Sequence, residues 1–576
     1  MSMNQNTAEN GYTASDALND ALVKAGVSYI FINSGTDYPP IIESWAKSEI
    51  EGRPKPEIII MPQELVGMSA AHGYAQITGE PQAVFVHVDV GTQSLGGAVH
   101  NAFRSRIPVF ILAGISPYTM EGELKGGRTS QIQFIQNTSD QASIVREYSK
   151  LNYEFRTGKN IQQMLYRMLQ LSKSDPAGPV YAMASREVLE EEGWDVNEDM
   201  ALWEPISPTA LDADSLNTLA EALQKAENPF IITSYLGRNK DSVAELVSLS
   251  DKLAIPVVEM LQTYMNFPGD HPMHLGFEPR PFLKDADLIL VLDCDLPWMP
   301  AAFKPSKDCR VFYIDIDPIK EKIPLWHIPA EKSIKADTFT ALTQLNTKLE
   351  SDAGKQDNVK ISARRQRLEK LHFEQRENWK KDETQQGEQI TPAFLTACIR
   401  EIIDEDTIVL AESQTNRVKI DHHLPRNKPG TFFQNGGSSL GWHGGAAIGM
   451  KLACPDKEII ALTGDGSYIF SGPTAVYWMA MKYKTPFMTV IYNNQGWTAP
   501  KSVTKGQHPD GYAVKNNLYW ANFDPPARLD LIAEAAGGAF AKTVSDPADL
   551  KSALLEGQQA VRNGIPAVIN VMLPPG

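Results

Sequence analysis

Short apolar runs alternate with longer amphipathic stretches along the first part of the chain. The apolar runs are interpreted as strands at 57–61, 83–89 and 108–113, and the stretches between them as helices at 64–78 and 91–106. The first of these helices is expected to end at Gly79, because glycine favours helix C-termini. Continuous apolar strands separated by helices indicate a parallel sheet that is covered on both faces.

The same pattern occurs twice more. The second segment has apolar runs at 229–233, 255–260, 288–292 and 310–315, and the third has them at 407–411, 458–463, 486–492 and 567–572. Linkers are expected near 190–210 and 350–385, and the highly charged second linker is predicted to be a solvated helix. The sequence therefore predicts an α/β protein of three doubly wound parallel-sheet domains, at 1–190, 205–350 and 380–576.

Composition narrows the class of protein. A chain of 576 residues is too long for one core and fits about three domains. The net charge of −16 argues against a nucleic-acid surface. Four scattered cysteines without a C-x-x-C pair indicate free thiols in a reducing compartment. The N-terminus has no basic start and no apolar run is long enough to cross a bilayer, so we expect a cytoplasmic protein without membrane contact.

Two polar clusters follow neighbouring predicted strands of the third segment. Gly464-Asp465-Gly466-Ser467 comes directly after one strand, and Asn493-Asn494 comes directly after the next. Both are expected at the carboxyl ends of parallel strands, where ligands bind in open α/β sheets. The Asp465 carboxylate and the Asn494 oxygen suit Mg²⁺, and the glycines let the backbone approach a phosphate. An isolated Gly-Asp-Gly is often a turn, but its pairing with Asn-Asn favours a magnesium and diphosphate site.

This pair of clusters resembles the diphosphate-binding signature of thiamine-diphosphate enzymes, most closely the acetolactate synthase and benzoylformate decarboxylase group. The resemblance covers nearly the whole chain and is weakest in the middle segment. It implies a pyrimidine-binding, a central and a diphosphate-binding domain. It also implies that Asp465, Asn494 and the carbonyl of Gly496 bind Mg²⁺, and that Gly464, Gly466 and Ser467 contact the diphosphate.

The other half of the family's site is expected in the first domain. Glu64 precedes Ala71-His72-Gly73-Tyr74-Ala75, which is similar to the family's glutamate followed by A-x-G-Y-A. A glutamate in the first turn of a helix is otherwise a favourable dipole partner. The resemblance implies that Glu64 hydrogen-bonds the cofactor's aminopyrimidine and so promotes proton removal from the thiazolium ring, which then serves as the electron sink.

Two loops of the third domain resemble further cofactor contacts. The segment 436–442 looks like the family stretch in which a bulky apolar residue wedges between the two cofactor rings. This implies Leu440 as the wedge and the Ser438 carbonyl as the acceptor for the cofactor's amino group, although a glycine-rich loop with a core leucine fits equally well. Gln414 and Thr415 align with a second diphosphate-contacting loop.

Substrate contacts are expected in the first domain. His87 lies in a segment that resembles the one bearing an active-site histidine in benzoylformate decarboxylase, and an imidazole there could relay protons. Thr36 matches a loop position that faces the substrate, and Gln136 corresponds to a glutamine beside the cofactor. A structural histidine and a plain turn are the alternatives for His87 and Thr36.

The resemblance implies a carbon–carbon lyase or ligase that uses thiamine diphosphate and Mg²⁺ on a small 2-oxo acid, with acetolactate synthase-like decarboxylation and carboligation. The alternatives are a simple 2-oxo acid decarboxylase of the benzoylformate decarboxylase type and a catalytically silent paralogue.

The stretch 293–298 replaces the family's arginine-bearing segment near flavin, which argues against FAD. The family's site lies between two subunits, so a homodimer or homotetramer is expected. A dehydrogenase would need a G-x-G-x-x-G turn after an early strand, and none is found in a suitable place.

Overall fold

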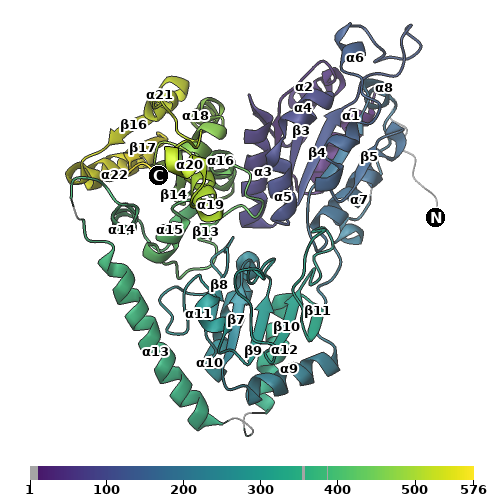
Figure 1. The fold of residues 1–576 in the computed structure, drawn as a ribbon. Coiled ribbons are helices and arrows are strands. Elements are labelled where there is room, and N and C mark those ends of the chain that lie inside the picture. Colours follow the sequence, from purple (N-terminus) through teal and green to yellow (C-terminus); the bar gives the residue numbers. More distant parts are fainter. Residues whose placement is uncertain (1–10, 197, 353, 355–356, 386) are drawn as a thin grey trace.

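The chain folds into three α/β domains, each built on one sheet of parallel strands (Figure 1). The computed structural model describes residues 11–196, 198–352, 354, 357–385 and 387–576. Helices lie on both faces of the sheets, which confirms the predicted fold class of three doubly wound parallel-sheet domains. Among the described residues, none of the helices is long and apolar enough to cross a bilayer, and all four cysteines are free thiols.

The first domain holds a six-stranded sheet in the order β2-β1-β3-β4-β6-β5. Its strands are β1 (Tyr29–Ile32), β2 (Glu57–Ile60), β3 (Gln82–Val86), β4 (Val109–Gly114), β5 (Asn152–Glu154) and β6 (Val180–Ala184). Its α-helices are α1 (Ala14–Lys24), α2 (Pro39–Glu51), α3 (Glu64–Thr78), α4 (Val88–Ser94), α5 (Gly97–Arg104), α6 (Ile132–Ile135), α7 (Ile161–Lys173) and α8 (Arg186–Glu190). The chain moves outward in opposite directions from β1 and β3, so the crevice between these two strand ends is the position at which this kind of sheet binds ligands.

The middle domain has the strand order β11-β10-β9-β7-β8. Its strands are β7 (Pro229–Thr233), β8 (Val257–Glu259), β9 (Leu288–Leu292), β10 (Arg310–Asp315) and β11 (Lys332–Lys335). Its α-helices are α9 (Ala213–Lys225), α10 (Lys240–Leu253), α11 (Arg280–Leu283) and α12 (Thr338–Ser351). The four apolar runs predicted as strands in this segment become β7, β8, β9 and β10, of which β8 lies at the edge of the sheet.

The third domain repeats the strand order of the first domain, as β13-β12-β14-β15-β17-β16. Its strands are β12 (Ile408–Glu412), β13 (Phe432–Phe433), β14 (Ile459–Gly464), β15 (Met488–Asn493), β16 (Phe540–Val544) and β17 (Ala567–Met572). Its α-helices are α14 (Pro392–Ile402), α15 (Arg417–His423), α16 (Trp442–Ala453), α17 (Asp465–Phe470), α18 (Pro473–Lys482), α19 (Thr498–Gln507), α20 (Tyr512–Asn516), α21 (Leu529–Gly537) and α22 (Pro547–Arg562). The equivalent crevice in this sheet lies between the ends of β12 and β14.

Helices α3 and α16 join the first and third domains (Figure 1). A Cβ atom built on Gly73 would overlap the backbone of Ala446, and one built on Gly449 would overlap the carbonyl group of Ala70. Glycine is needed at both positions because the two helix backbones touch. This contact fixes the N-terminus of α3, where Glu64 lies, relative to the third domain of the same chain.

The charged second linker forms α13 (Asn358–Lys381), which runs along the outside of the molecule from the middle to the third domain (Figure 1). The helix was predicted, but it is not solvated all round. The buried guanidinium of Arg364 donates to the carbonyl oxygens of Ala254 and Ala226 at 3.0 and 3.1 Å. At the other end, the Trp379 ring stacks on His422 with 3.8 Å between the ring centroids.

The single helix predicted at 91–106 is wrong. The structure has two helices there, α4 and α5, and α4 begins at Val88 directly after β3. The break falls at Gly96, which has φ +49° and ψ −132°, a conformation that a helix interior does not contain. As a result, α4 starts at the end of β3 and packs against β4.

Candidate functional site

Glu64 lies at the crevice of the first sheet. Glu64 is the first residue of α3 and is 8% exposed. Its carboxylate accepts a hydrogen bond of 3.0 Å from the side-chain nitrogen of Asn33, which follows β1. Burial raises the pKa of Glu64, and the hydrogen bond from Asn33 opposes this rise only in part. A carboxyl group with a raised pKa can donate a proton to a ring nitrogen, which is the role that the resemblance gives to Glu64.

The other predicted residues of the first domain lie at the same edge of the sheet. His87 follows β3, and its two ring nitrogens lie 2.6 Å from Asp37 Oδ1 and 2.9 Å from Gln136 Oε1. Thr36 is exposed beside Asp37, and its carbonyl oxygen accepts from Arg186 at 3.4 Å. The charge of His87 also lowers the pKa of Glu64. The first domain thus gathers all of its predicted site residues around one crevice.

The Asn494 side-chain amide meets two oxygens in the third domain. One terminal atom of this amide lies 2.9 Å from the Gly496 carbonyl oxygen and 3.2 Å from Asp465 Oδ1, and the other lies 2.9 Å from Thr498 Oγ1. Without a cation, the amide nitrogen faces the two oxygens and donates to both, and the amide oxygen accepts from the Thr498 hydroxyl.

Turned the other way, the Asn494 amide would present its oxygen beside the Asp465 carboxylate and the Gly496 carbonyl, and a cation would satisfy this set of three oxygens. Neighbouring ligands of an octahedral Mg²⁺ at about 2.1 Å lie about 3 Å apart, close to the distances found here. The described residues contain no cluster of three or more His, Cys, Asp or Glu that could hold a metal. A carboxylate, an amide oxygen and a carbonyl oxygen form a different, harder ligand set, and these residues fit Mg²⁺.

Asp465 is held in place by the backbone. Its Oδ2 accepts from the Gly496 N–H at 2.8 Å, which leaves Oδ1 facing Asn494. Burial raises the pKa of Asp465 to about 6, although backbone hydrogen bonds oppose the rise. A bound cation would favour the ionised carboxylate and lower this pKa.

The backbone beside Asp465 is open where a phosphate group would lie. A Cβ atom at Gly464 would meet Ser413 Oγ at 3.9 Å, whereas one at Gly466 would overlap the Trp497 ring. Gly464 therefore borders free space, and Gly466 is needed for the packing of Trp497. Ser467 is buried in the first turn of α17.

The loops after β12 and before α16 lie next to this position. Gln414 and Thr415 are exposed directly after β12, at the crevice between β12 and β14. Ser438 is exposed with φ +61°, and Leu440 is half-buried. Gln414 and Ser438 line one cavity of about 150 Å³ together with residues of the first and middle domains.

Residues that the sequence interpretation missed hold this loop. Asn101 of α5 donates to the Ser439 carbonyl oxygen and accepts from the Ser439 N–H, both at 2.9 Å. The buried carboxylate of Glu412 accepts from the N–H groups of Gly441 and His443 at 2.7 and 2.8 Å, and so caps α16. The position of Glu412 at the end of a predicted strand was an available signal, whereas Asn101 gave none.

The strand ends of the middle domain are occupied by ion pairs. The Lys320 ammonium is buried and lies 2.6 Å from Asp315 and 3.0 Å from Asp295, and Arg106 of the first domain also pairs with Asp295. The absence of flavin stays a prediction.

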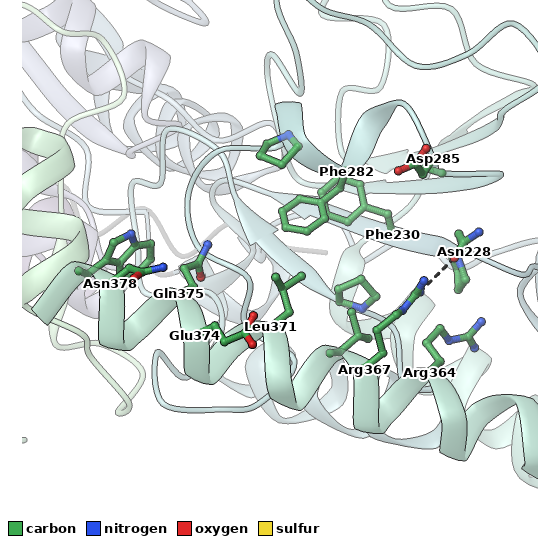
Figure 2. Close-up of a pocket in the computed structure, with 16 residues that line it drawn as sticks. Asn228, Phe230, Phe282, Asp285, Arg364, Arg367, Leu371, Glu374, Gln375 and Asn378 are labelled. Atoms are coloured by element: carbon green, nitrogen blue, oxygen red, sulfur yellow. Dashed lines mark hydrogen bonds between the residues drawn. The ribbon is translucent and has the colours of Figure 1, made fainter.

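A separate cavity of about 560 Å³ lies between α13 and the middle domain (Figure 2). None of the predicted site residues lines it.

Three family models match the chain and cover both halves of the site. The N-terminal binding domain of thiamine pyrophosphate enzymes matches residues 12–144, the central domain matches 216–345 and the C-terminal binding domain matches 415–571. The chain belongs to the thiamine pyrophosphate enzyme family. Glu64 and His87 lie within the first match, and Asp465 and Asn494 lie within the third.

Two relatives and one solved structure resemble this chain at low sequence identity. The acetolactate synthase of Bacillus subtilis is 21% identical over 94% of this chain and 90% of its own. The benzoylformate decarboxylase of Pseudomonas aeruginosa is 23% identical over 84% of this chain and 86% of its own. The solved structure of a thiamine diphosphate-dependent 4-hydroxybenzoylformate decarboxylase from Rhodococcus jostii superposes with a TM-score of 0.79 at 21% identity, covering 98% of this chain and 99% of that one. The thiamine pyrophosphate enzyme described here therefore shares its whole three-domain fold with that structure.

Proposed function

We propose that this thiamine pyrophosphate enzyme uses Mg²⁺ and thiamine diphosphate to decarboxylate a small 2-oxo acid. The observation that carries the proposal is the convergence of the Asp465 carboxylate, the Asn494 amide and the Gly496 carbonyl beside the open backbone at Gly464. The names of the relatives support the substrate class, because acetolactate synthase and benzoylformate decarboxylase both appear among them. A silent paralogue would have no reason to keep this oxygen cluster together with a buried Glu64.

The residues of the third domain would hold the cofactor's charged end. Asp465, Asn494 and the Gly496 carbonyl would bind Mg²⁺, whose charge would offset that of the diphosphate. Backbone near Gly464 and Gly466 and the side chains of Ser467, Gln414 and Thr415 would contact the diphosphate. When bound, thiamine diphosphate supplies the nucleophilic carbon that adds to the 2-oxo group and the ring that accepts the electrons released with CO₂.

The other residues would act on protons and orientation. Glu64 would hold a proton at its carboxyl group against the aminopyrimidine ring nitrogen, aided by the burial that raises its pKa. The Ser438 carbonyl would orient the amino group of that ring, and Leu440 would separate the two rings. Thr36 and His87 would contact the substrate.

The product of the reaction is proposed to be an aldehyde. After CO₂ leaves, the former 2-oxo carbon must gain either a proton or a second carbonyl compound. His87 lies at the crevice with hydrogen-bond partners on both ring nitrogens, which supports it as the proton donor. Acetolactate synthase-like carboligation is the second candidate, because an acetolactate synthase is among the relatives that match nearly the full chain.

We also propose that the site forms between the first domain of one subunit and the third domain of another. Large apolar side chains stand exposed beside both halves: Val90, Phe134 and Ile135 in the first domain, and Phe470, Trp497 and Trp520 in the third. Exposed apolar clusters of this kind favour a protein–protein interface at this position. Glu64 is hydrogen-bonded to Asn33 of the first domain, and Asp465 is hydrogen-bonded to Gly496 of the third.

The proposal is tested by CO₂ release from a panel of 2-oxo acids, measured with and without thiamine diphosphate and Mg²⁺, with product analysis. We expect release that needs both cofactors and an aldehyde as the main product, because His87 supplies a proton. An acetohydroxy acid or acyloin as the main product would favour the carboligase instead. No release from any acid, although the cofactors bind, would refute the proposed substrate class.

A further inference from the structure

We propose that Asp37 is a positioning residue that holds His87 as a protonated donor, with its Nε2–H directed into the crevice. The inference rests on the proposed function, since it assigns to this couple the proton that completes decarboxylation. Neither the sequence patterns nor the family resemblance pointed to Asp37. The geometry around one carboxylate carries the argument.

Both oxygens of Asp37 are used to fix the end of β3. Oδ1 lies 2.6 Å from His87 Nδ1, and Oδ2 accepts from the Val88 N–H at 3.3 Å. The Asp37 side chain is 3% exposed, so water does not compete strongly for these bonds. A carboxylate only accepts hydrogen bonds, and therefore Nδ1 of His87 must carry a hydrogen.

Two glycines leave space for the Asp37 and His87 side chains, and the backbone at Val88 is strained. A Cβ atom at Gly35 would overlap the His87 ring, and one at Gly114 would overlap the Asp37 carboxylate. Val88 has φ +31°, which is strained for a β-branched residue. The Thr92 hydroxyl donates to the Val88 carbonyl oxygen at 2.6 Å and helps to hold this turn. Such strain persists where surrounding contacts fix it, and it clusters at functional sites.

The charges that face His87 favour its protonated form. The hydrogen bond to Asp37 raises the pKa of His87 most, burial opposes the rise, and the Asp37 charge, Gln136 and Asp89 add to it. Glu64, at the start of α3, also interacts electrostatically with His87. A raised pKa means that the protonated fraction is complete at low pH and is lost as pH rises through that pKa.

The second ring nitrogen is therefore the one that exchanges its proton. Nε2 lies 2.9 Å from Gln136 Oε1, which accepts the Nε2–H in the resting protein. In the reaction, the C–COO⁻ bond breaks, CO₂ leaves, and the remaining carbon gains the Nε2 proton to give the aldehyde. His87 becomes neutral and recovers a proton from solvent, so each turnover consumes one proton and no oxidant or reductant is needed.

The test is the Asp37→Asn variant, with Asp140→Asn as the matched control, since Asp140 is exposed and pairs with Arg146. An asparagine keeps the shape, but its amide can donate to Nδ1 and so favours the neutral ring. Carbethoxylation of His87 by diethyl pyrocarbonate, read by peptide mass spectrometry against pH, reports the neutral imidazole without needing turnover. We expect labelling to begin at lower pH in Asp37→Asn than in the wild type, with no change in Asp140→Asn.

The activity profile is the second readout. Above neutral pH, we expect kcat for aldehyde formation to fall roughly 10- to 100-fold in Asp37→Asn, and its alkaline limb to move to lower pH. Identical labelling curves in the two proteins would overturn the proposal, and so would a shifted labelling curve with an unmoved kcat profile. If the wild type releases no CO₂ while the labelling shift is present, the failure lies in the proposed function and not in the contact between Asp37 and His87.

Discussion

Glu64→Gln is expected to lower kcat by about 10²- to 10⁴-fold while leaving thiamine diphosphate binding nearly unchanged. The Glu64 carboxyl group is buried, its pKa is raised by that burial, and Asn33 holds one of its oxygens at 3.0 Å. Glutamine has the same shape and can still hydrogen-bond a ring nitrogen, but it has no titratable proton to share. The measurement is steady-state CO₂ release together with calorimetric titration of the cofactor in the presence of Mg²⁺.

Glu80→Gln is the matched control for this substitution. Glu80 follows the same helix, is exposed and pairs with Lys173, so its loss should change neither quantity. Wild-type kcat in Glu64→Gln would contradict the role assigned to Glu64. Loss of cofactor binding in that variant would instead give Glu64 a binding role.

Asp465→Ala is expected to abolish the stabilisation of the enzyme by Mg²⁺ and thiamine diphosphate, and with it CO₂ release. Alanine removes the one charged ligand of the proposed cation site and leaves only the Asn494 amide and the Gly496 carbonyl. A ligand at 100 times its Kd stabilises a protein by about 2.7 kcal/mol, a difference that thermal unfolding detects readily. The measurement is the change in Tm on adding MgCl₂ and thiamine diphosphate together.

The apo proteins should behave alike in this experiment. Burial already raises the pKa of Asp465 to about 6, so its removal relieves a desolvated carboxylate and costs little stability. Asp510→Ala, at an exposed position beyond α19, is the control and should retain the full rise in Tm. An equal rise in Asp465→Ala and the wild type would show that the cation binds elsewhere.

The third-domain half of the site could be predicted because its residues follow two consecutive strands of the sheet. The apolar runs before Gly464 and Asn493 identify parallel strands, and parallel strands bring their carboxyl ends to one edge. Asp465 and Asn494 were therefore predicted together, and the structure brings the Asn494 amide within 3.2 Å of Asp465 Oδ1. The three sheets followed from the same apolar periodicity.

The supporting contacts could not be predicted from local pattern. Asn101 reaches Ser439 across 338 positions of sequence, and Asp37 reaches His87 across 50. Each is an ordinary polar residue in its own segment, and only the packing of α5 or the turn after β1 gives it a partner. The break at Gly96 was missed for a related reason, because a glycine inside a helical pattern does not by itself reveal its φ and ψ.

The most direct test of a shared site mixes the two inactive variants. Glu64→Gln and Asp465→Ala are co-expressed, and CO₂ release from the mixed oligomers is compared with that of each variant alone. If each site takes Glu64 from one subunit and Asp465 from another, random mixing restores about a quarter of the wild-type sites. Recovery near that level is the predicted result. No recovery above the separate variants, with mixed oligomers shown to have formed, would contradict a site built between two subunits.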